Sequence, residues 1–171
     1  INGAGGGVGT IGLQIAKVLG AKHVTGVDHQ DKLQKMRSFG FDEVIDYTQV
    51  DFTTKTETYD LILDTKINRS PLKFLKALKP GGTYVTVGGR IFRLIQTLLA
   101  SPLVRLFSRK RVRLLALKTN QDLDYISELV DAGKIVPVTE GPYPLHQLPE
   151  AMQRFGKGRH FGKVIIAITP D

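Results

Sequence analysis

The sequence predicts an α/β fold built on a doubly wound parallel sheet. Strand-like and helix-like segments alternate along the 171 residues, as parallel strands joined by crossover helices require. A glycine-rich loop directly precedes the first helix-like segment, and Tyr59–Asp64 is nearly continuously apolar, which is typical of a strand buried on both faces of a sheet. The chain length suits one domain, and we expect residues 1–171 to form it.

The first half of the chain supplies the elements around the loop. Apolar residues recur at helical spacing after it, which predicts a helix with one buried face made of Val8, Ile11, Gly12, Ile15, Ala16 and Leu19. The segments that follow are expected to be a strand at Val24–Asp28, a helix at Asp31–Phe39 ending at Gly40, strands at Glu43–Tyr47 and Tyr59–Asp64, and a helix at Ser70–Leu78 with Ser70 as its cap and Pro71 in its first position.

The second half continues the alternation. Pro80-Gly81-Gly82 predicts a tight turn before a strand at Thr83–Val87, and Ile91–Phe107 predicts a long apolar helix interrupted at Pro102. The remaining segments are expected to be a strand at Val112–Leu117, a helix at Asp122–Ala132, a short strand at Val136–Val138, a helix at Leu148–Phe155 and a closing strand at Lys163–Ile168.

The loop Ala4–Gly9 has the residue types that a dinucleotide's pyrophosphate needs. A phosphate binds to the unpaired backbone N–H groups at a helix N-terminus, and side chains there would block its approach. In an A-x-G-x-x-G pattern, Gly6 lets the backbone reach the pyrophosphate and Gly9 lets the helix pack closely. Asp28 ends the next strand, where an acid accepts hydrogen bonds from a ribose. The pattern therefore predicts a dinucleotide site.

Composition excludes several other kinds of site. The chain has no cysteine, so it forms no disulfide and no cysteine-based zinc site, and its four histidines lack metal-ligand spacing. We expect no metal bound by this segment. No apolar run is long enough to cross a membrane. The net charge is +8, and a basic cluster of Arg105, Arg109, Lys110, Arg111 and Arg113 lacks the interleaved aromatic residues of a single-strand nucleic-acid binder.

Several stretches resemble the medium-chain dehydrogenase/reductase superfamily, above all its quinone oxidoreductase-like and zinc-type alcohol dehydrogenase-like members. They are NGAGGGVGT, GFDEVIDYT, YDLILD, LKPGGTYVTVGG and the tail GKIVPVTEGPYPLHQLPEAMQRF…GKVII. The resemblance implies a Rossmann-type nucleotide-binding domain of an enzyme that transfers hydride between a nicotinamide and a carbonyl, enone, quinone or alcohol. It also implies an N-terminal catalytic domain that this chain lacks. Residues 135–171 would return toward that domain and leave apolar surface uncovered, the chain alone would be inactive, and any catalytic zinc ligands would lie in the missing domain.

The resemblance also assigns the cofactor-binding residues. Gly6, Gly7, Val8 and Gly9 match the pyrophosphate loop, and Val87, Gly88 and Gly89 match the loop that passes the nicotinamide ring. The choice between NAD and NADP stays open. Asp28 favours NAD because its charge would repel a 2′-phosphate, whereas Lys32 and Tyr47, helped by His29, resemble residues of NADP-using relatives. A carboxylate facing a dianion is the larger effect at short range, so we favour NAD.

Two other functions remain as alternatives. An S-adenosylmethionine-dependent methyltransferase also has a glycine loop, an acid after its second strand and an LKPGG-like turn. A nucleotide- or RNA-binding module would use the basic cluster, although we expect no nucleic-acid partner. The expected ligands are a nicotinamide dinucleotide and a small-molecule substrate. We further expect a cytoplasmic protein with no membrane partner, and a homodimer is consistent with the edge-strand pairing of some relatives.

Overall fold

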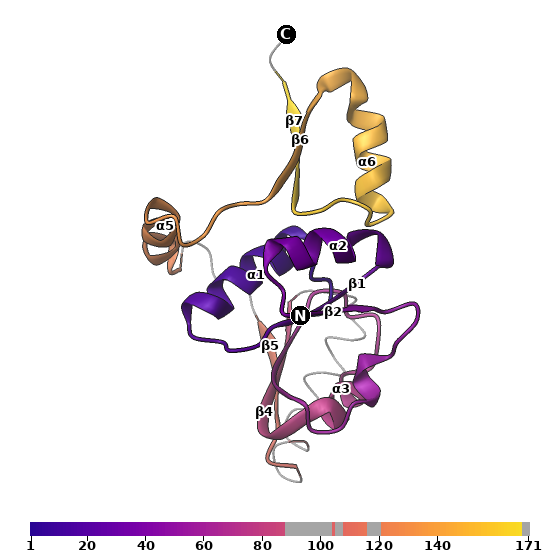
Figure 1. Ribbon diagram of the computed structural model, residues 1–171, viewed down its shortest axis with the longest axis vertical. Coiled ribbons are helices and arrows are strands. Elements are labelled where there is room, and N and C mark those ends of the chain that lie inside the picture. Colours follow the sequence, from indigo (N-terminus) through magenta and orange to yellow (C-terminus); the bar gives the residue numbers. More distant parts are fainter. Residues whose placement is uncertain (88–103, 105–107, 116–120, 169–171) are drawn as a thin grey trace. The chain divides into compact units, whose positions relative to one another are not determined.

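The computed structural model describes residues 1–87, 104, 108–115 and 121–168 (Figure 1). The chain forms two compact units, one of residues 1–3 and 47–121 and the other of residues 4–46 and 122–171. Every described strand pair is parallel, and helices alternate with strands along the chain. These observations agree with the predicted α/β class.

The N-terminal part of the second unit contains two helices and two strands. They are α1 (Gly7–Val18), β1 (Thr25–Asp28), α2 (Gln30–Phe39) and β2 (Glu43–Asp46). The strands β1 and β2 pair from Thr25 opposite Glu43 to Asp28 opposite Asp46. Helix α2 ends at Gly40, whose φ of 114° lies in the left-handed region that glycine adopts without steric cost. The buried apolar residues of this part include Leu13, Val24, Val27, Met36, Phe41 and Ile45.

The buried face of α1 differs from the predicted one. The buried residues are Gly9, Thr10 and Leu13, whereas Val8 and Leu19, which periodicity placed on the buried face, are exposed. Burial of Thr10 is tolerated because its hydroxyl donates to the Gly6 carbonyl at 3.1 Å. Small residues therefore occupy the start of the helix, where the backbone of the loop comes close, and apolar periodicity does not detect this requirement.

The C-terminal part of the same unit contains α5 (Leu123–Asp131), β6 (Thr139–Pro144), a short 3₁₀ helix (Leu145–Gln147), α6 (Leu148–Gly156) and β7 (Lys163–Ala167). Strands β6 and β7 form a two-stranded parallel sheet, and α6 runs beside it (Figure 1). The short strand predicted at Val136–Val138 is wrong. The backbone N–H and carbonyl of Val136 are bonded to the Gln14 side chain, at 2.7 and 3.0 Å, so they are not part of a strand ladder.

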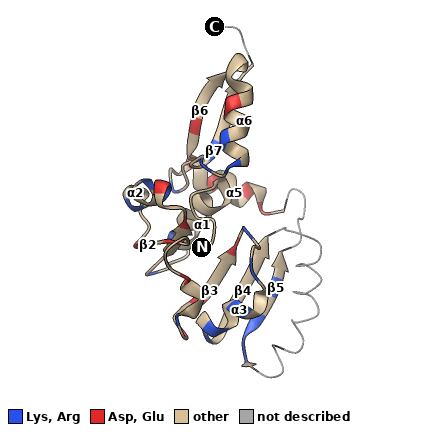
Figure 2. Ribbon diagram, turned by 90° about the vertical axis from the view of Figure 1, so that its right-hand side faces the viewer, with Lys and Arg blue, Asp and Glu red and all other residues tan. Residues whose placement is uncertain are grey.

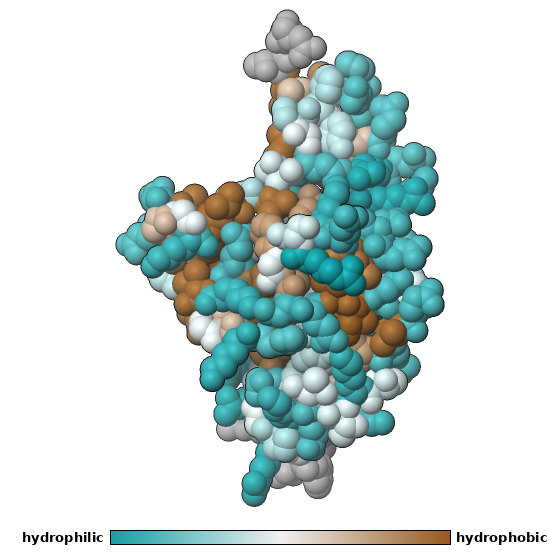
Figure 3. Space-filling model, viewed as in Figure 1, coloured by the Kyte–Doolittle hydropathy of each residue, from teal (hydrophilic) through white to brown (hydrophobic). Residues whose placement is uncertain are grey.

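Apolar side chains are exposed along this C-terminal part, as the resemblance implied. They include Val136, Leu145, Met152, Phe155 and Ile168. Figure 3 shows brown, apolar residues along the C-terminal strands. That a catalytic domain covers this surface stays a prediction.

The first unit is a three-stranded parallel sheet in the order β3 (Tyr59–Asp64), β4 (Leu78–Val87), β5 (Arg111–Leu115), with helix α3 (Pro71–Ala77) and a 3₁₀ turn at Phe52–Thr54. The predicted turn Pro80-Gly81-Gly82 lies inside β4 rather than before it. Tyr59 pairs with Leu78 but Leu61 pairs with Thr83, so the extra residues of β4 form an irregularity that the sheet accommodates.

An aromatic cluster forms the core of this unit. Phe74 stacks on Tyr84 with ring centroids 4.8 Å apart, and Phe52 contacts Phe74 at 5.8 Å and Tyr59 at 6.2 Å. The predicted helix Ile91–Phe107 lies almost entirely outside the described residues. Within it only Val104 is described, and that residue is helical and buried.

Candidate functional site

The glycine loop leads directly into the N-terminus of α1. Gly6 is the N-cap residue in extended conformation, and no side chain caps the first turn, which also contains no acidic residue. The N–H groups at this helix end are therefore not bonded by a capping side chain, which suits an anionic ligand. At Gly9 a Cβ atom would lie 2.5 Å from the Ala4 Cα and 2.6 Å from its carbonyl carbon, so the backbone approach requires glycine.

Hydrogen bonds from two other segments hold the loop in place. The Ala4 N–H donates to the Val27 carbonyl of β1 at 3.1 Å, and the Gly5 N–H donates to Asp28 Oδ2 at 2.8 Å. The Gly162 N–H donates to the Gly5 carbonyl at 3.0 Å, and Gly6 forms a parallel bridge with Gly162. The loop is consequently fastened both by β1 and by the residue that precedes β7.

Asp28 lies at the end of β1, as predicted, but its carboxylate is buried among protein groups. Oδ1 accepts the His29 N–H at 2.8 Å and lies 3.3 Å from the Lys32 ammonium nitrogen. The side chains of Asp28 and Lys32 are only 4% and 3% exposed. The resemblance assigned Lys32 to a possible 2′-phosphate. The structure pairs its ammonium group with Asp28, which the sequence did not predict.

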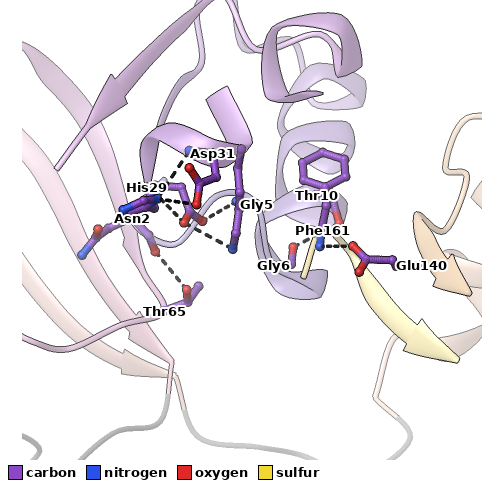
Figure 4. A network of polar contacts seen from close by, with 11 residues as sticks. Asn2, Gly5, Gly6, Thr10, His29, Asp31, Thr65, Glu140 and Phe161 are labelled. Carbon is purple, nitrogen blue, oxygen red and sulfur yellow. Dashed lines mark hydrogen bonds and ion pairs between the residues drawn. The ribbon is translucent and has the colours of Figure 1, made fainter. Parts of the chain in front are cut away.

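The other predicted residues of the β1 and β2 ends are accessible. His29 is the N-cap residue of α2; its Nδ1 lies 3.4 Å from the Asp31 N–H nitrogen and 3.2 Å from the Asp31 carboxylate, and Figure 4 shows the two side chains facing each other. Tyr47 directly follows β2, and its side chain is exposed.

The predicted nicotinamide loop is only partly described. Val87 is the last residue of β4, where it pairs with Leu115 of β5. Gly88 and Gly89 lie outside the described residues.

Lys163 is a candidate site residue that the sequence reasoning missed. A Cβ atom at Gly7 would lie 2.7 Å from both Cδ and Cε of Lys163, so the lysine side chain extends across Gly7 at the start of α1. This places the aliphatic stem of a cation beside the N-terminus of the helix. The sequence signal for this residue is the glycine before it. Gly162 takes a φ of 78°, which favours glycine, and its N–H donates to the Gly5 carbonyl of the loop.

A second strand-ending carboxylate, Asp64 of β3, is fully buried. Oδ1 accepts hydrogen bonds from the side-chain amide of Asn2 (2.9 Å) and from the backbone N–H groups of Lys66 (3.0 Å) and Ile67 (3.1 Å). Oδ2 accepts a hydrogen bond from the Tyr84 hydroxyl (2.8 Å). Burial raises the pKa of Tyr84, and the charge of Asp64 raises it further, so the phenol stays a donor. These bonds also support Ile67 at φ 48°, a strained conformation for a β-branched residue.

The basic cluster lies in the first unit, around the start of β5. Figure 2 shows blue lysine and arginine positions along β5 and α3. One of its cations, the Lys110 ammonium, donates to the Leu75 carbonyl at 2.8 Å and thus has a structural partner. Arg105 lies outside the described residues.

No group of three or more His, Cys, Asp or Glu side chains in residues 1–87, 104, 108–115 and 121–168 is arranged to hold a metal ion. None of the helices in that part of the chain has both the length and the apolar character of a bilayer span.

One family model and several known proteins are similar to this chain. A family model described as zinc-binding dehydrogenase matches residues 39–166. The Mus musculus protein named NAD(P)H oxidoreductase RTN4IP1, mitochondrial, is 36% identical over 189 residues, covering 99% of this chain and 47% of that protein. The Arabidopsis thaliana NADPH-dependent alkenal/one oxidoreductase, chloroplastic, is 30% identical over 178 residues, covering 99% of this chain and 40% of that protein.

The solved structure of the quinone oxidoreductase from Coxiella burnetii has the same fold, with a TM-score of 0.76 at 20% identity, covering 98% of this chain and 51% of that one. The chain spans about half the length of the curated relatives it matches. The relatives favour an oxidoreductase domain over a methyltransferase or an RNA-binding module. The chain belongs to the zinc-binding dehydrogenase family, within the medium-chain dehydrogenase/reductase superfamily.

Proposed function

We propose that this chain is the nicotinamide-dinucleotide-binding part of an oxidoreductase that transfers hydride to or from a carbonyl, enone, quinone or alcohol. The observation that carries the proposal is the loop Ala4–Gly9. Its glycines allow a close backbone approach, and it ends at a helix N-terminus that no side chain caps. The names of the relatives, an NAD(P)H oxidoreductase and an alkenal/one oxidoreductase, support the reaction class.

The residues of the loop fit the pyrophosphate of such a cofactor. The backbone N–H groups of Gly7, Val8 and Gly9 would bind phosphate oxygens, and the Lys163 ammonium would supply a positive charge beside them. When bound, the nicotinamide ring supplies the hydride chemistry. This chain's own contribution is to bind and orient the cofactor, and the substrate-activating groups of the whole enzyme are proposed to lie elsewhere in it.

The choice between NAD and NADP belongs to the same proposal. The carboxylate of Asp28 favours NAD, and we keep NAD as the favoured cofactor on that ground. The adjacent Lys32 ammonium, at 3.3 Å, weakens this preference because it offsets the negative charge that a 2′-phosphate would meet. A homodimer and a cytoplasmic location are also proposed.

The test is a binding titration of the full-length protein with NADH, NADPH and S-adenosylmethionine. We expect both nicotinamide dinucleotides to bind and S-adenosylmethionine not to bind. The variant Lys163→Met should weaken both dinucleotides by a similar factor, about tenfold, because the pyrophosphate is common to both. The matched variant Lys157→Met, at an exposed lysine of the same unit, should leave binding unchanged. Binding of neither dinucleotide by the unaltered protein would contradict the proposal.

A further inference from the structure

The carboxylate of Glu140 in β6 holds the segment that leads into β7. Oε2 accepts the backbone N–H of Phe161 at 2.9 Å (Figure 4). Oε1 accepts the Tyr143 hydroxyl at 2.9 Å and the Nε–H of Arg154, whose guanidinium supplies the opposite charge. Because the Glu140 side chain is only 15% exposed, these donors replace most of the water that a carboxylate otherwise binds.

The segment that Glu140 holds also carries Lys163 to the start of α1. Phe161 stands two residues before Lys163, whose N–H donates to the Val138 carbonyl at 2.8 Å. The stem of Lys163 lies across Gly7, where an added Cβ atom would be 2.7 Å from both Cδ and Cε of the lysine. A bond at the Phe161 N–H therefore restricts the backbone from which the Lys163 side chain extends.

We propose that Glu140 is a positioning residue of the dinucleotide site. By holding the Phe161 N–H, it places the Lys163 ammonium group beside the pyrophosphate. The inference rests on the proposed function, since it explains how Lys163 comes to lie at the site. It adds a residue of β6 that acts on the cofactor through Lys163.

The sign of the effect distinguishes positioning from a direct effect of charge. A carboxylate repels an anionic ligand, so if Glu140 acted only through its charge, its replacement by an uncharged residue would strengthen dinucleotide binding. If Glu140 acts by placing Lys163, the same replacement weakens dinucleotide binding.

A double-variant cycle tests whether Glu140 acts through Lys163. In the full-length protein at neutral pH, Lys163→Met should raise the dissociation constant of NADH about tenfold, and Glu140→Gln should raise it about fivefold, since the lysine is displaced but still present. The double variant Glu140→Gln/Lys163→Met should bind NADH about as weakly as Lys163→Met, because only a lysine that is present can be positioned. Losses that multiply to about fiftyfold overturn the inference. Unchanged or stronger NADH binding by Glu140→Gln also overturns it.

The matched control for the carboxylate is Asp42→Asn. Asp42 belongs to the same compact unit as Glu140, and its carboxylate likewise accepts a backbone N–H, that of Val24 at 2.7 Å, and pairs with a cation, Lys17 at 2.6 Å. Asp42 has no bond to the segment that carries Lys163, so this variant should leave the dissociation constant of NADH unchanged. A loss as large as that of Glu140→Gln would indicate a general loosening of the unit and would overturn the inference.

Hydrogen exchange of the ligand-free protein measures the positioning without a cofactor. In Glu140→Gln the amides of Phe161 and Lys163 should exchange faster and the amide of Val24 at the unaltered rate, and unaltered exchange at Lys163 overturns the inference. If Glu140→Gln does not fold, Glu140→Asp, which keeps the charge on a shorter side chain, should give smaller changes in the same direction. Failure of the unaltered protein to bind any dinucleotide would instead contradict the proposed function, while the exchange at Lys163 still decides whether Glu140 holds this segment.

Discussion

The substitution Gly9→Ala tests a close backbone approach in the candidate site. Gly9 is buried in the first turn of α1, and an added Cβ would fall within 3 Å of the Ala4 carbonyl oxygen, Cα and carbonyl carbon. All three are backbone atoms, and the Ala4 N–H is bonded to the Val27 carbonyl at 3.1 Å. The clash therefore cannot be relieved by a side-chain rotation, and either α1 or the loop must shift.

The expected loss of stability follows from this geometry. Overpacking a well-packed site costs about 1–3 kcal/mol, and three rigid backbone contacts put this site at the upper end, at about 3 kcal/mol. For a protein of this size, each kcal/mol lowers Tm by about 2–4 °C, so the variant should melt about 6–12 °C lower. Displacing α1 also moves its N–H groups away from the loop, so NADH binding should weaken in the same variant.

Chemical denaturation in urea and a titration with NADH measure the two effects. The matched control is Gly156→Ala, because no atom lies within 4 Å of the Cβ added at Gly156 in α6. That variant should have unchanged or slightly higher stability, since alanine is the better helix former. A Gly9→Ala protein with the stability and NADH affinity of the unaltered chain would refute the close-approach argument.

Two further predictions concern buried and half-buried acids. Tyr84→Phe removes the hydroxyl that donates to Asp64 Oδ2 at 2.8 Å, and urea denaturation should show a free energy of unfolding lower by about 1–3 kcal/mol. The control Tyr125→Phe, at an exposed tyrosine of α5, should leave the free energy of unfolding unchanged. Equal stability of the two variants would contradict the role of this bond. Burial raises the pKa of Glu140, but the bond from Arg154 and other donors outweigh it and lower the pKa to about 2 from an ordinary 4.5. The stabilisation by ionised Glu140 is thus complete above pH 4.5 and is lost as the pH falls toward 2. Unfolding followed by circular dichroism at a series of pH values should show this loss of stability, and the variant Glu140→Gln should show a smaller loss. If the variant loses as much stability between pH 4.5 and 2 as the unaltered protein, Glu140 is not the source of the loss.

Local signals in the sequence predicted the regular elements well. The strand Tyr59–Asp64 has the predicted bounds, because an apolar run between turn residues marks both of its ends. Helix α2 ends before Gly40, which adopts the positive φ that glycine favours. The turn within LKPGG was identified, but its place inside β4 was not, since the bulged pairing with β3 depends on a partner strand that lies elsewhere in the sequence.

Contacts between distant residues were beyond the reach of local patterns. Gln14 binds the backbone of Val136 across a separation of 122 residues, and this contact replaces the predicted short strand. Lys163 lies against Gly7 from the other end of the chain. Both contacts arise because the tail returns to α1 and to the glycine loop before it, and the periodicity of α1 and of β7 does not reveal which residues these elements meet.

The acids at strand ends show most clearly where the sequence reasoning stops. Asp28 and Asp64 each end a parallel strand, which is where ligands bind in sheets of this class. In its own compact unit each carboxylate accepts a backbone N–H from the residues that follow it and a further bond from the first five residues of the chain, from Gly5 and from Asn2. An acid at this position can therefore hold the polypeptide as well as a ribose. The two roles share one sequence pattern. The bond from the Gly5 N–H shows the first role for Asp28, and the backbone of the adjoining loop keeps the capacity to bind phosphate.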